Sequence, residues 1–413
     1  MYSPHFMVKK TVFLLFLCIG LNQAYAQRFL TKVFDSVFVT ADIPYGFNYN
    51  YKGDSTTLLM DIYAPVGDTM QARPVVVLAH GGSFVQGSRK SADISTVCRK
   101  LGEMGYVTIS IDYRLGINIT SGKTLEQEFA QAVFRATQDG RAAVRFIYKS
   151  IANGNTQKLD INQIYTGGIS AGGVLGLHLA FLDAPAELAT LPINTDSLGG
   201  LEGNSGNPGY SWKVKGVVSL CGALSNVAFI NNNKDISICN MHGTADATVP
   251  YKTDYFKFFG NNVALLQGSY SVDSAAQKQG IDTRLYTFNG ADHVPFSGTS
   301  ATQQKYMDTT LTYVAKYLYK HVTGITPTSI LEPKNNSLLF DCYPNPSTDI
   351  IELTFTSTER KQIKLIDMQG SEVKAIETNG LEAQLLVSDL AKGMYLIEVK
   401  STSSVLRKHI LVQ

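Results

Sequence analysis

The sequence has almost no net charge, few cysteines and no apolar run long enough to cross a membrane, and each lack excludes a class of protein. Lys and Arg number 36 and Asp and Glu number 34 among 413 residues, which gives a formal net charge of +2. Two of the positive charges, Lys9 and Lys10, lie in an N-terminal leader without acidic residues. The rest of the chain is close to neutral, so nothing indicates a basic face that binds nucleic acid.

Cysteine is scarce and forms no metal-binding pattern. Of the five cysteines, Cys18 falls in the leader, and Cys98, Cys221, Cys239 and Cys342 remain. No Cys or His spacing typical of a zinc site is present, so no metal is expected. Four cysteines allow three complete pairings, and buried free thiols are an equally good interpretation. The sequence leaves that choice open.

The apolar run near the N-terminus is too short for a membrane helix and has the organisation of a signal peptide. It combines two lysines, an apolar core at residues 12–21 and the small-residue site Ala24-Tyr25-Ala26. We predict cleavage after this site, a mature chain that begins near Gln27, and export to a compartment that permits disulfides. No integral membrane segment is expected after cleavage.

From residue 36 to residue 321, short apolar runs alternate with amphipathic ones. Strands are predicted at 36–47, 56–64, 74–79, 107–111, 161–165, 214–221, 236–241 and 283–288. Helices are predicted at 91–104, 125–150, 174–182, 261–279 and 302–321. The first two strands indicate an antiparallel hairpin, and the later alternation indicates a mostly parallel sheet with helices on both faces.

The pattern changes after residue 323. Residues 324–340 contain two prolines in a polar mix, which indicates a linker. Short strands without helices follow, at 350–355, 362–368, 384–387, 394–399 and 405–412. The predicted organisation is a signal peptide, an α/β domain, the linker and a small all-β sandwich domain, at 1–26, 27–323, 324–340 and 341–413.

The motif that carries most chemistry is Gly168-Ile169-Ser170-Ala171-Gly172, between a predicted strand and a predicted helix. A serine that attacks a carbonyl has to stand clear of the backbone on a very tight turn. The positions two before and two after it crowd each other, so glycine is needed at both. The helix behind the serine directs its free N–H groups at the reacting oxygen. A glycine-rich turn without chemistry is the alternative.

A serine hydroxyl needs a neighbouring base, and the base needs a carboxylate that orients it. Among the seven histidines, His293 is the best candidate, because it lies in a loop just after the last core strand. Asp246, just beyond another core strand, is the candidate acid. Asp292 is the alternative, although side chains adjacent in sequence rarely point at each other. The order Ser170, Asp246, His293 is that of the α/β-hydrolases.

Backbone N–H groups must face the charge that develops on the carbonyl oxygen. Ala171 supplies one such group, and His80-Gly81-Gly82 supplies the other, because glycine lets the backbone approach the substrate. A simple tight turn is the alternative for the second motif. His80 and His242 each precede a glycine at a strand end and are expected to brace turns. His178, inside the helix that follows the serine, is expected to serve packing.

With these motifs the chain resembles the α/β-hydrolase superfamily, specifically carboxylesterases with an HGG oxyanion motif. Three stretches carry the resemblance, within about residues 36–322: His80-Gly81-Gly82-Ser83-Phe84, Asp112-Tyr113-Arg114 and 168–172. The stretch 242–250 is similar to the acid segment of dienelactone-hydrolase-like and prolyl-oligopeptidase-like members. Ser83 stands where many relatives have a third glycine, so either Gly81 or Gly82 is the first donor.

The resemblance implies an α/β-hydrolase fold in which Asp112 and Arg114 are structural. Bacterial esterases that act on acetyl or feruloyl groups of plant polysaccharide combine the same features. We therefore predict a serine carboxylic-ester hydrolase that forms an acyl-enzyme without a cofactor. A serine peptidase and a catalytically inactive hydrolase-fold binding module are the alternatives.

The predicted substrate pocket has walls from residues near the strand ends, Phe84, Val85, Leu115 and Met241. The loop 183–211, rich in Gly, Pro, Asn and Ser, either roofs the active site or is a floppy surface insertion. It does not have the pattern of a phosphate-binding loop. Chain length and alcohol of the ester stay open.

The C-terminal part resembles a type A sorting domain of type IX secretion. Residues 342–346, Gly393-Met394-Tyr395 and 408–412 carry this resemblance. It implies the type IX secretion machinery as a partner, passage across the outer membrane, and then surface attachment or release. A generic β-sandwich accessory domain is the alternative.

Overall fold

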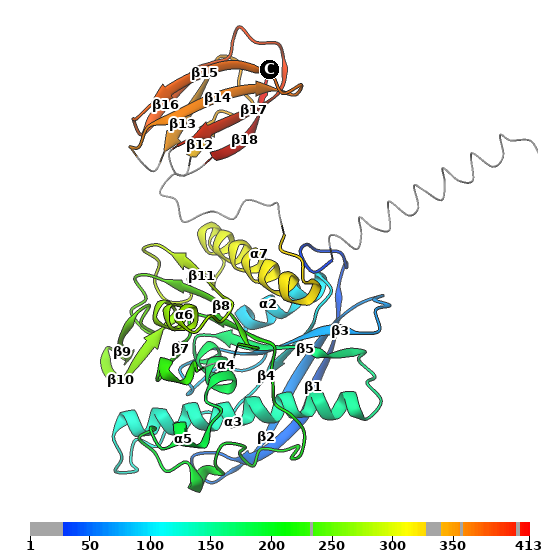
Figure 1. Cartoon of the computed structure of the whole chain (residues 1–413), viewed down its shortest axis with the longest axis vertical. Coiled ribbons are helices and arrows are strands. Elements are labelled where there is room, and N and C mark those ends of the chain that lie inside the picture. The colour runs from blue at the N-terminus through cyan, green and yellow to red at the C-terminus, as the bar shows by residue number, and fades with distance from the viewer. Residues whose placement is uncertain (1–27, 232–233, 328–339, 356–357, 402–404) are drawn as a thin grey trace, which may run out of the picture. The chain divides into compact units, whose positions relative to one another are not determined.

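The computed structural model describes residues 28–231, 234–327, 340–355, 358–401 and 405–413 (Figure 1). The chain forms two compact units, Met1–Pro327 and Thr328–Gln413. The predicted signal peptide and most of the predicted linker lie outside the described residues. Within those residues, none of the helices is long and apolar enough to cross a membrane.

A large sheet forms the centre of the first unit. Its strands are β1 (Val37–Tyr49), β2 (Ser55–Pro65), β3 (Arg73–Ala79), β4 (Val107–Ile111), β5 (Leu159–Ile169), β6 (Gly216–Leu220), β8 (Ser237–Gly243) and β11 (Thr283–Phe288). The order is β1-β2-β4-β3-β5-β6-β8-β11. β2 pairs antiparallel with β1 and β4, and the strands from β4 to β11 run parallel. Every residue of β3 and β4 is buried, and for β3 the continuous apolar run at 74–79 predicts this.

Helices cover both faces of this sheet (Figure 1). They are α2 (Ala92–Glu103), α3 (Leu125–Ala152), α4 (Ala171–Phe181), α5 (Pro185–Leu188), α6 (Ser269–Lys278) and α7 (Ala301–Thr323), with 3-10 turns at Asp196–Leu198 and Val227–Phe229. α3, α4 and α6 contribute to one apolar core, and α2 and α7 contribute to the other. Capping boxes start α3 at Thr124 and α7 at Ser300. The prediction of an α/β fold is confirmed.

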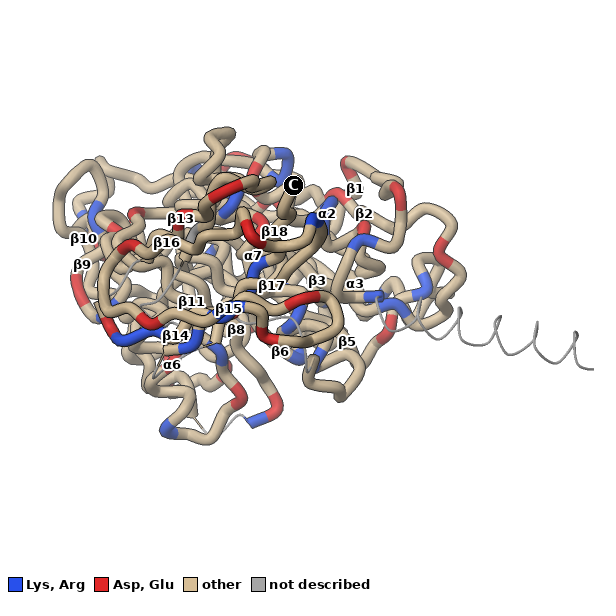
Figure 2. Tube along the Cα trace, turned by 90° about the horizontal axis from the view of Figure 1, so that it is seen from above, with Lys and Arg blue, Asp and Glu red and all other residues tan. Residues whose placement is uncertain are grey.

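Basic and acidic residues are interspersed along the described trace (Figure 2). The buried Arg89 joins the antiparallel and parallel parts of the sheet. Its guanidinium pairs with Asp42 of β1, with Asp61 of β2 at 2.8 Å, and with Asp112, which follows β4. A buried guanidinium needs such partners, because an unpaired buried charge is strongly destabilising.

The predicted helix at 261–279 is wrong in its first half. Residues Asn261–Gly268 form β10, and helix α6 begins only at Ser269. β10 pairs antiparallel with β9 (Thr253–Phe258), a strand that was not predicted, and with the short β7 (Ala223–Leu224). Together they make a small three-stranded sheet. Hydrogen bonding to these two strands overrides the local helical preference of the segment.

The second unit is built from antiparallel strands with a core of its own. One sheet contains β12 (Phe340–Tyr343), β13 (Ile350–Phe355) and β16 (Glu382–Leu386), and the other contains β15 (Glu372–Thr378), β14 (Lys361–Asp367), β17 (Gly393–Lys400) and β18 (Val405–Val412). Alternate residues such as Leu353, Leu365 and Ile397 are buried. The prediction of an all-β domain is confirmed. β12 and β15 were not predicted, and β15 has no fully buried side chain that would signal it.

Candidate active site

Ser170 occupies the turn between β5 and α4, with φ of 55° and ψ of −116°. This conformation is strained for a residue with a side chain. A Cβ on Gly168 would lie 2.1 Å from the carbonyl oxygen of Ala79, and one on Gly172 would lie 2.0 Å from the same oxygen. The two glycines therefore let the turn pack against the end of β3. Ser170 stands at the carboxyl edge of the parallel strands, where binding sites lie in such sheets.

Ser170, His293 and Asp246 form a hydrogen-bonded line. Ser170 Oγ lies 2.8 Å from His293 Nε2, and His293 Nδ1 lies 2.6 Å from Asp246 Oδ2. Because the carboxylate can only accept, Nδ1 carries the proton and Nε2 accepts the hydrogen of Ser170. The three residues follow β5, β11 and β8 respectively. The carboxyl ends of these parallel strands bring them together.

Four donors surround the buried carboxylate of Asp246. Oδ1 accepts from the N–H groups of Thr248 at 2.9 Å and Val249 at 2.8 Å. Oδ2 accepts from His293 and also lies 3.0 Å from Nε2 of His242. Burial acts to raise the pKa of Asp246, but the hydrogen bonds from His242 and His293 outweigh it and hold the pKa well below its usual value. Asp246 therefore stays ionised beside the imidazole of His293.

His242 does more than brace a turn. Its ring is fully buried, with Nδ1 2.8 Å from Ser269 Oγ and Nε2 3.0 Å from both the Val249 carbonyl oxygen and Asp246 Oδ2. Sequence reasoning missed the contact with Asp246. The four-residue spacing of His242 and Asp246, across the end of β8, is the signal that could have suggested it.

Asp292, the alternative acid, does not meet the imidazole. Its Oδ1 accepts from the N–H of Ala247 at 2.9 Å and from the backbone N–H of His293 at 2.7 Å. Asp292 thus joins the loop after β8 to the loop after β11. The side-chain partner of the His293 ring is Asp246.

The residues expected to bind the oxyanion lie beside Ser170. Ala171 is the first residue of α4, a position whose N–H has no partner within a helix. A Cβ on Gly81 would lie 3.4 Å from Ser170 Cβ. Gly82 has φ of 118°, and a Cβ there would lie 2.1 Å from the carbonyl oxygen of Gln86, so this turn requires glycine.

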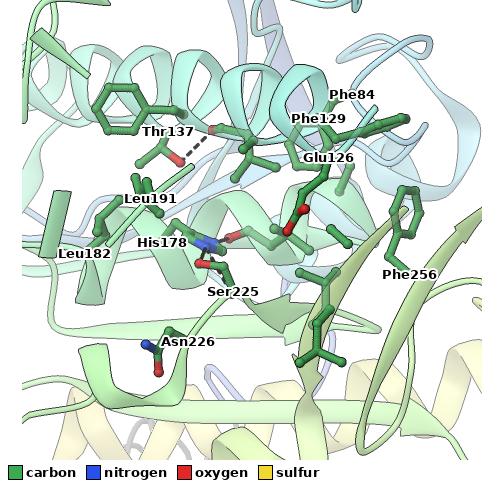
Figure 3. A pocket seen from close by; sticks show the side chains of 18 of the residues that line it. Phe84, Glu126, Phe129, Thr137, His178, Leu182, Leu191, Ser225, Asn226 and Phe256 are labelled. Atoms are coloured by element: carbon green, nitrogen blue, oxygen red, sulfur yellow. Dashed lines mark hydrogen bonds between the residues drawn. The ribbon is translucent and has the colours of Figure 1, made fainter. Parts of the chain in front are cut away.

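An apolar cavity of about 270 Å³ has Ser170 among its lining residues. Figure 3 shows side chains that line this cavity. One face of α4 and one face of α3 form two of its walls, and β9 and β10 form another. Lining residues from these elements include Val174, His178, Phe129, Val133, Phe256 and Leu266. A more polar groove meets Ser170 at a different side and is lined by residues that include Gln86, Asp93, Thr248, His293 and Ser297.

The predicted pocket walls are only partly correct. Phe84 lines the apolar cavity, whereas Val85 and Leu115 pack against the core and are not among its lining residues. Met241 is fully buried in the core beneath α2 and α7, so it does not form a wall of this cavity. Successive side chains of a strand point to opposite faces, and in β8 it is His242 that faces the site.

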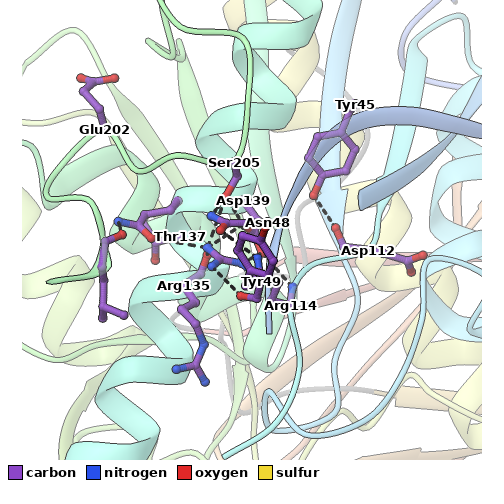
Figure 4. A network of polar contacts seen from close by, with 12 residues as sticks. Tyr45, Asn48, Tyr49, Asp112, Arg114, Arg135, Thr137, Asp139, Glu202 and Ser205 are labelled. Atoms are coloured by element: carbon purple, nitrogen blue, oxygen red, sulfur yellow. Dashed lines mark hydrogen bonds and ion pairs between the residues drawn. The ribbon is translucent and has the colours of Figure 1, made fainter. Parts of the chain in front are cut away.

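The segment 183–211 is tied to α3 by polar contacts rather than floppy (Figure 4). The amide of Gln138 donates to the carbonyl oxygens of Leu198 at 2.9 Å and Gly200 at 2.8 Å. The hydroxyl of Ser205 donates to Asp139 Oδ1 at 2.5 Å, and the same carboxylate pairs with Arg114. Earlier residues of the segment, Thr190 to Pro192, line the apolar cavity. The segment therefore supplies part of the cavity wall.

The cysteines of the first unit are buried thiols. Cys98, Cys221 and Cys239 form no disulfide, and burial raises the pKa of Cys98 and Cys239 to about 12. Among the described residues, the potential metal ligands of Cys221, Asp246 and His293 lie within 4.8 Å of one another. This set does not fit a metal ion well, because burial raises the thiol pKa of Cys221 and hydrogen bonds occupy both other groups.

Known proteins resemble parts of this chain. Residues 60–235 match the BD-FAE family, and residues 341–413 match the secretion system C-terminal sorting domain. The non-reducing polyketide synthase prhL of Penicillium brasilianum is 34% identical over 155 residues, 35% of this chain and 6% of the synthase. The gibberellin receptor GID1B of Arabidopsis thaliana is 34% identical over 85 residues, 16% of this chain and 24% of the receptor. The chain thus spans a small part of these relatives.

Solved structures of a thermophilic esterase of Thermogutta terrifontis are also similar. The propionate-bound form has 20% identity and a TM-score of 0.47, and covers 68% of this chain and 96% of the esterase chain. The form phosphorylated by paraoxon has 20% identity and a TM-score of 0.47, with 71% and 97% coverage. The fold and the family matches agree: residues 60–235 match a BD-FAE esterase domain within an α/β-hydrolase fold, and residues 341–413 match a secretion sorting domain of the type IX system.

Proposed function

We propose that the first unit is a serine carboxylic-ester hydrolase in which Ser170 is the nucleophile, His293 the general base and acid, and Asp246 the orienting carboxylate. The observation that carries this proposal is the hydrogen-bonded line from Ser170 through His293 to Asp246, at 2.8 Å and 2.6 Å. The strained turn and the first N–H groups of α4 support it, because they fit a nucleophile and an oxyanion site.

The reaction follows from the positions of these atoms. His293 Nε2 takes the hydroxyl proton as Ser170 Oγ bonds to the ester carbonyl carbon, and the N–H groups of Ala171 and of Gly81 or Gly82 bind the oxyanion. The ester C–O bond then breaks, and His293 gives its proton to the leaving alcohol. Water, activated by the same imidazole, attacks the acyl-enzyme and releases the acid and free Ser170.

The position of His293 supports a proposal for the two sides of the substrate. The leaving oxygen must meet His293 Nε2 to receive its proton, so the alcohol occupies the polar groove that His293 lines. The acyl group then occupies the apolar cavity along α4. We propose esters of short acyl chains or of acyl groups linked to polysaccharide, acetyl and feruloyl included. A cavity of about 270 Å³ leaves ample room beyond an acetyl group.

We also propose that the second unit directs the chain through the type IX machinery and across the outer membrane, to the cell surface or beyond. The sorting-domain match over residues 341–413 supports this role. A chain that ends at residue 340, expressed in a bacterium with that machinery, should accumulate inside the outer membrane while the full chain reaches the surface or the medium. Equal export of both chains would contradict the role.

A catalytically inactive binding module is the second candidate, because one relative carries the name of a receptor. Initial rates on p-nitrophenyl esters from acetate to palmitate separate the candidates, with Ser170→Ala as the blank. Turnover that disappears in Ser170→Ala would support the esterase, and the best chain length would measure the acyl cavity. Folded wild-type protein without turnover on any ester would contradict it and favour a binding module or a peptidase.

A further inference from the structure

A second serine–histidine pair lies in the acyl cavity, away from Ser170. His178 Nε2 lies 2.9 Å from Ser225 Oγ and 3.2 Å from the Ser225 backbone nitrogen. Both residues line the cavity, and Figure 3 shows their side chains meeting there. His178 belongs to α4 and Ser225 follows β7. This pair plays no part in the reaction proposed above.

The proton positions in this pair follow from its partners. His178 Nδ1 lies 2.8 Å from the carbonyl oxygen of Val174, an acceptor, so Nδ1 carries the ring proton. Burial lowers the pKa of His178 to about 4, so the ring is neutral and Nε2 has a free lone pair. That lone pair accepts from both the backbone N–H and the hydroxyl of Ser225. With its hydrogen directed at His178, Ser225 Oγ can offer the cavity only an acceptor.

The distance of this acceptor from the reacting centre is set by α4. Ser170 precedes the first residue of the helix, and His178 lies eight residues further on, roughly 12 Å along the axis at about 1.5 Å per residue. Between them, the cavity wall on α4 is apolar, at Ala171 and Val174. An extended acyl chain of about eight carbons covers most of this span, since each C–C bond of about 1.5 Å advances the zigzag chain by somewhat less than its own length.

We propose that Ser225, held by His178, is a specificity subsite that accepts a hydrogen bond from a hydroxyl group near the far end of an apolar acyl chain. The proposal rests on the proposed function, because it places the acyl group in this cavity. The substrate class is an ester of a hydroxylated acid with an apolar body two helical turns long. An acyl chain without a hydroxyl group would leave the Ser225 oxygen without a hydrogen-bond donor from the substrate.

The test compares two p-nitrophenyl esters, 8-hydroxyoctanoate and octanoate, which differ only in the terminal hydroxyl. In the wild type we expect kcat/KM to be about fivefold to tenfold higher for the hydroxylated ester, the usual worth of one neutral hydrogen bond. Ser225→Ala should bring the ratio close to one, and Ser225→Thr, which keeps the hydroxyl, should retain the preference. Because the two esters are compared on the same enzyme sample, the ratio of their kcat/KM values does not depend on the fraction of active enzyme.

Thr137→Val is the matched control. Thr137 also lines the cavity, but its side chain is fully buried and its hydroxyl donates to the Val133 carbonyl oxygen at 2.8 Å. Its removal should leave the wild-type ratio in place. A wild-type ratio near one, or a preference that survives in Ser225→Ala, would overturn the proposal. In either case, turnover that depends on Ser170 would leave the esterase intact, whereas absent turnover on both esters would contradict the esterase itself.

Discussion

Two of the serine–histidine pairs in the first unit, Ser170–His293 and Ser225–His178, border the apolar cavity, and they differ in the third partner of the imidazole. In the first pair, His293 accepts from Ser170 and donates to the carboxylate of Asp246. In the second, His178 accepts from Ser225 and donates to a backbone carbonyl oxygen. The serine–imidazole distances, 2.8 Å and 2.9 Å, are almost the same. Distance between serine and histidine therefore does not tell a nucleophile from a binding group.

The environment decides what each pair can do. A general base must carry a proton during the reaction, and an ionised carboxylate stabilises the resulting imidazolium far better than a carbonyl does. His293 is 20% exposed at the groove, whereas His178 is 2% exposed. Ser170 also stands at a helix start that offers N–H groups to an oxyanion. These differences support the proposal that Ser170 attacks the ester and that Ser225 recognises it.

The largest effect is expected from Asp246→Asn, which gives His293 a neutral partner of the kind that His178 has. The imidazolium loses its counter-charge, and the amide can fix the wrong tautomer, so kcat should fall by roughly 10³- to 10⁴-fold. Asp292→Asn, which alters the neighbouring carboxylate without touching the ring, is the control and should stay within about threefold. Ester hydrolysis at saturating substrate measures both. Equal losses would show that Asp246 has no special role.

Gly82→Ala tests the proposed oxyanion site, which lies beside Ser170. A Cβ would lie 2.1 Å from the carbonyl oxygen of Gln86 at a φ of 118°, so the loop must move and displace its donors. We expect a loss of roughly 10²-fold in kcat. Gly53→Ala is the matched control, because Gly53 also has positive φ but nothing within 4 Å of the new Cβ. Its effect should be confined to stability, measured by thermal unfolding.

His242→Leu removes one donor from the carboxylate of the first pair and leaves the carboxylate itself in place. Loss of the donor 3.0 Å from Asp246 Oδ2 raises the pKa of Asp246, because the hydrogen bond from His242 helps to keep this group ionised. We expect kcat to fall about tenfold and the acid limb of the kcat/KM profile, on which Asp246 must stay ionised, to move to higher pH. A fall in stability with an unmoved acid limb would mean that His242 serves packing alone.

The second pair should affect the stability of the fold rather than the rate of hydrolysis. The unfolded chain protonates His178 near pH 6.5, whereas the folded protein does so only near pH 4, so stability rises with pH between these values. As the pH falls through this window, His178 should account for a loss of about 3 kcal/mol in the free energy of unfolding. Urea unfolding of wild type and His178→Leu at several pH values measures it. Identical slopes would contradict the assignment of a neutral imidazole.

The sequence predicts the features that depend on the local pattern of apolar residues and on the motifs at the ends of strands. The buried runs of β3 and β4 and the periodic stripe of α3 were recognisable because each is a strong local signal. The motifs at 80–82, 168–172 and 242–246 each follow a predicted strand, which indicates that they lie at one edge of the sheet. The side chains of Ser170 and His293 meet at this edge. The catalytic roles themselves stay predictions.

Other features depend on contacts between distant segments, which local pattern does not report. The sequence of β10 favours a helix, because its partners, β7 and β9, are specified elsewhere in the chain. The sequence does not report the register of β8, so it does not show that Met241 faces the core, and a shift by one residue exchanges the two faces. The roles of His178 and His242 depend on the atoms that face each ring nitrogen, and these come from other loops.

Covalent labelling with a fluorophosphonate, followed by peptide mapping, tests the central claim most directly. The reagent phosphonylates an activated serine, and the full chain contains both pairs for comparison. We predict one adduct, on the peptide that contains Ser170, none on the peptide that contains Ser225, and none in Ser170→Ala. An adduct on Ser225, or folded wild-type protein without any adduct, would contradict the assignment of Ser170 as the nucleophile.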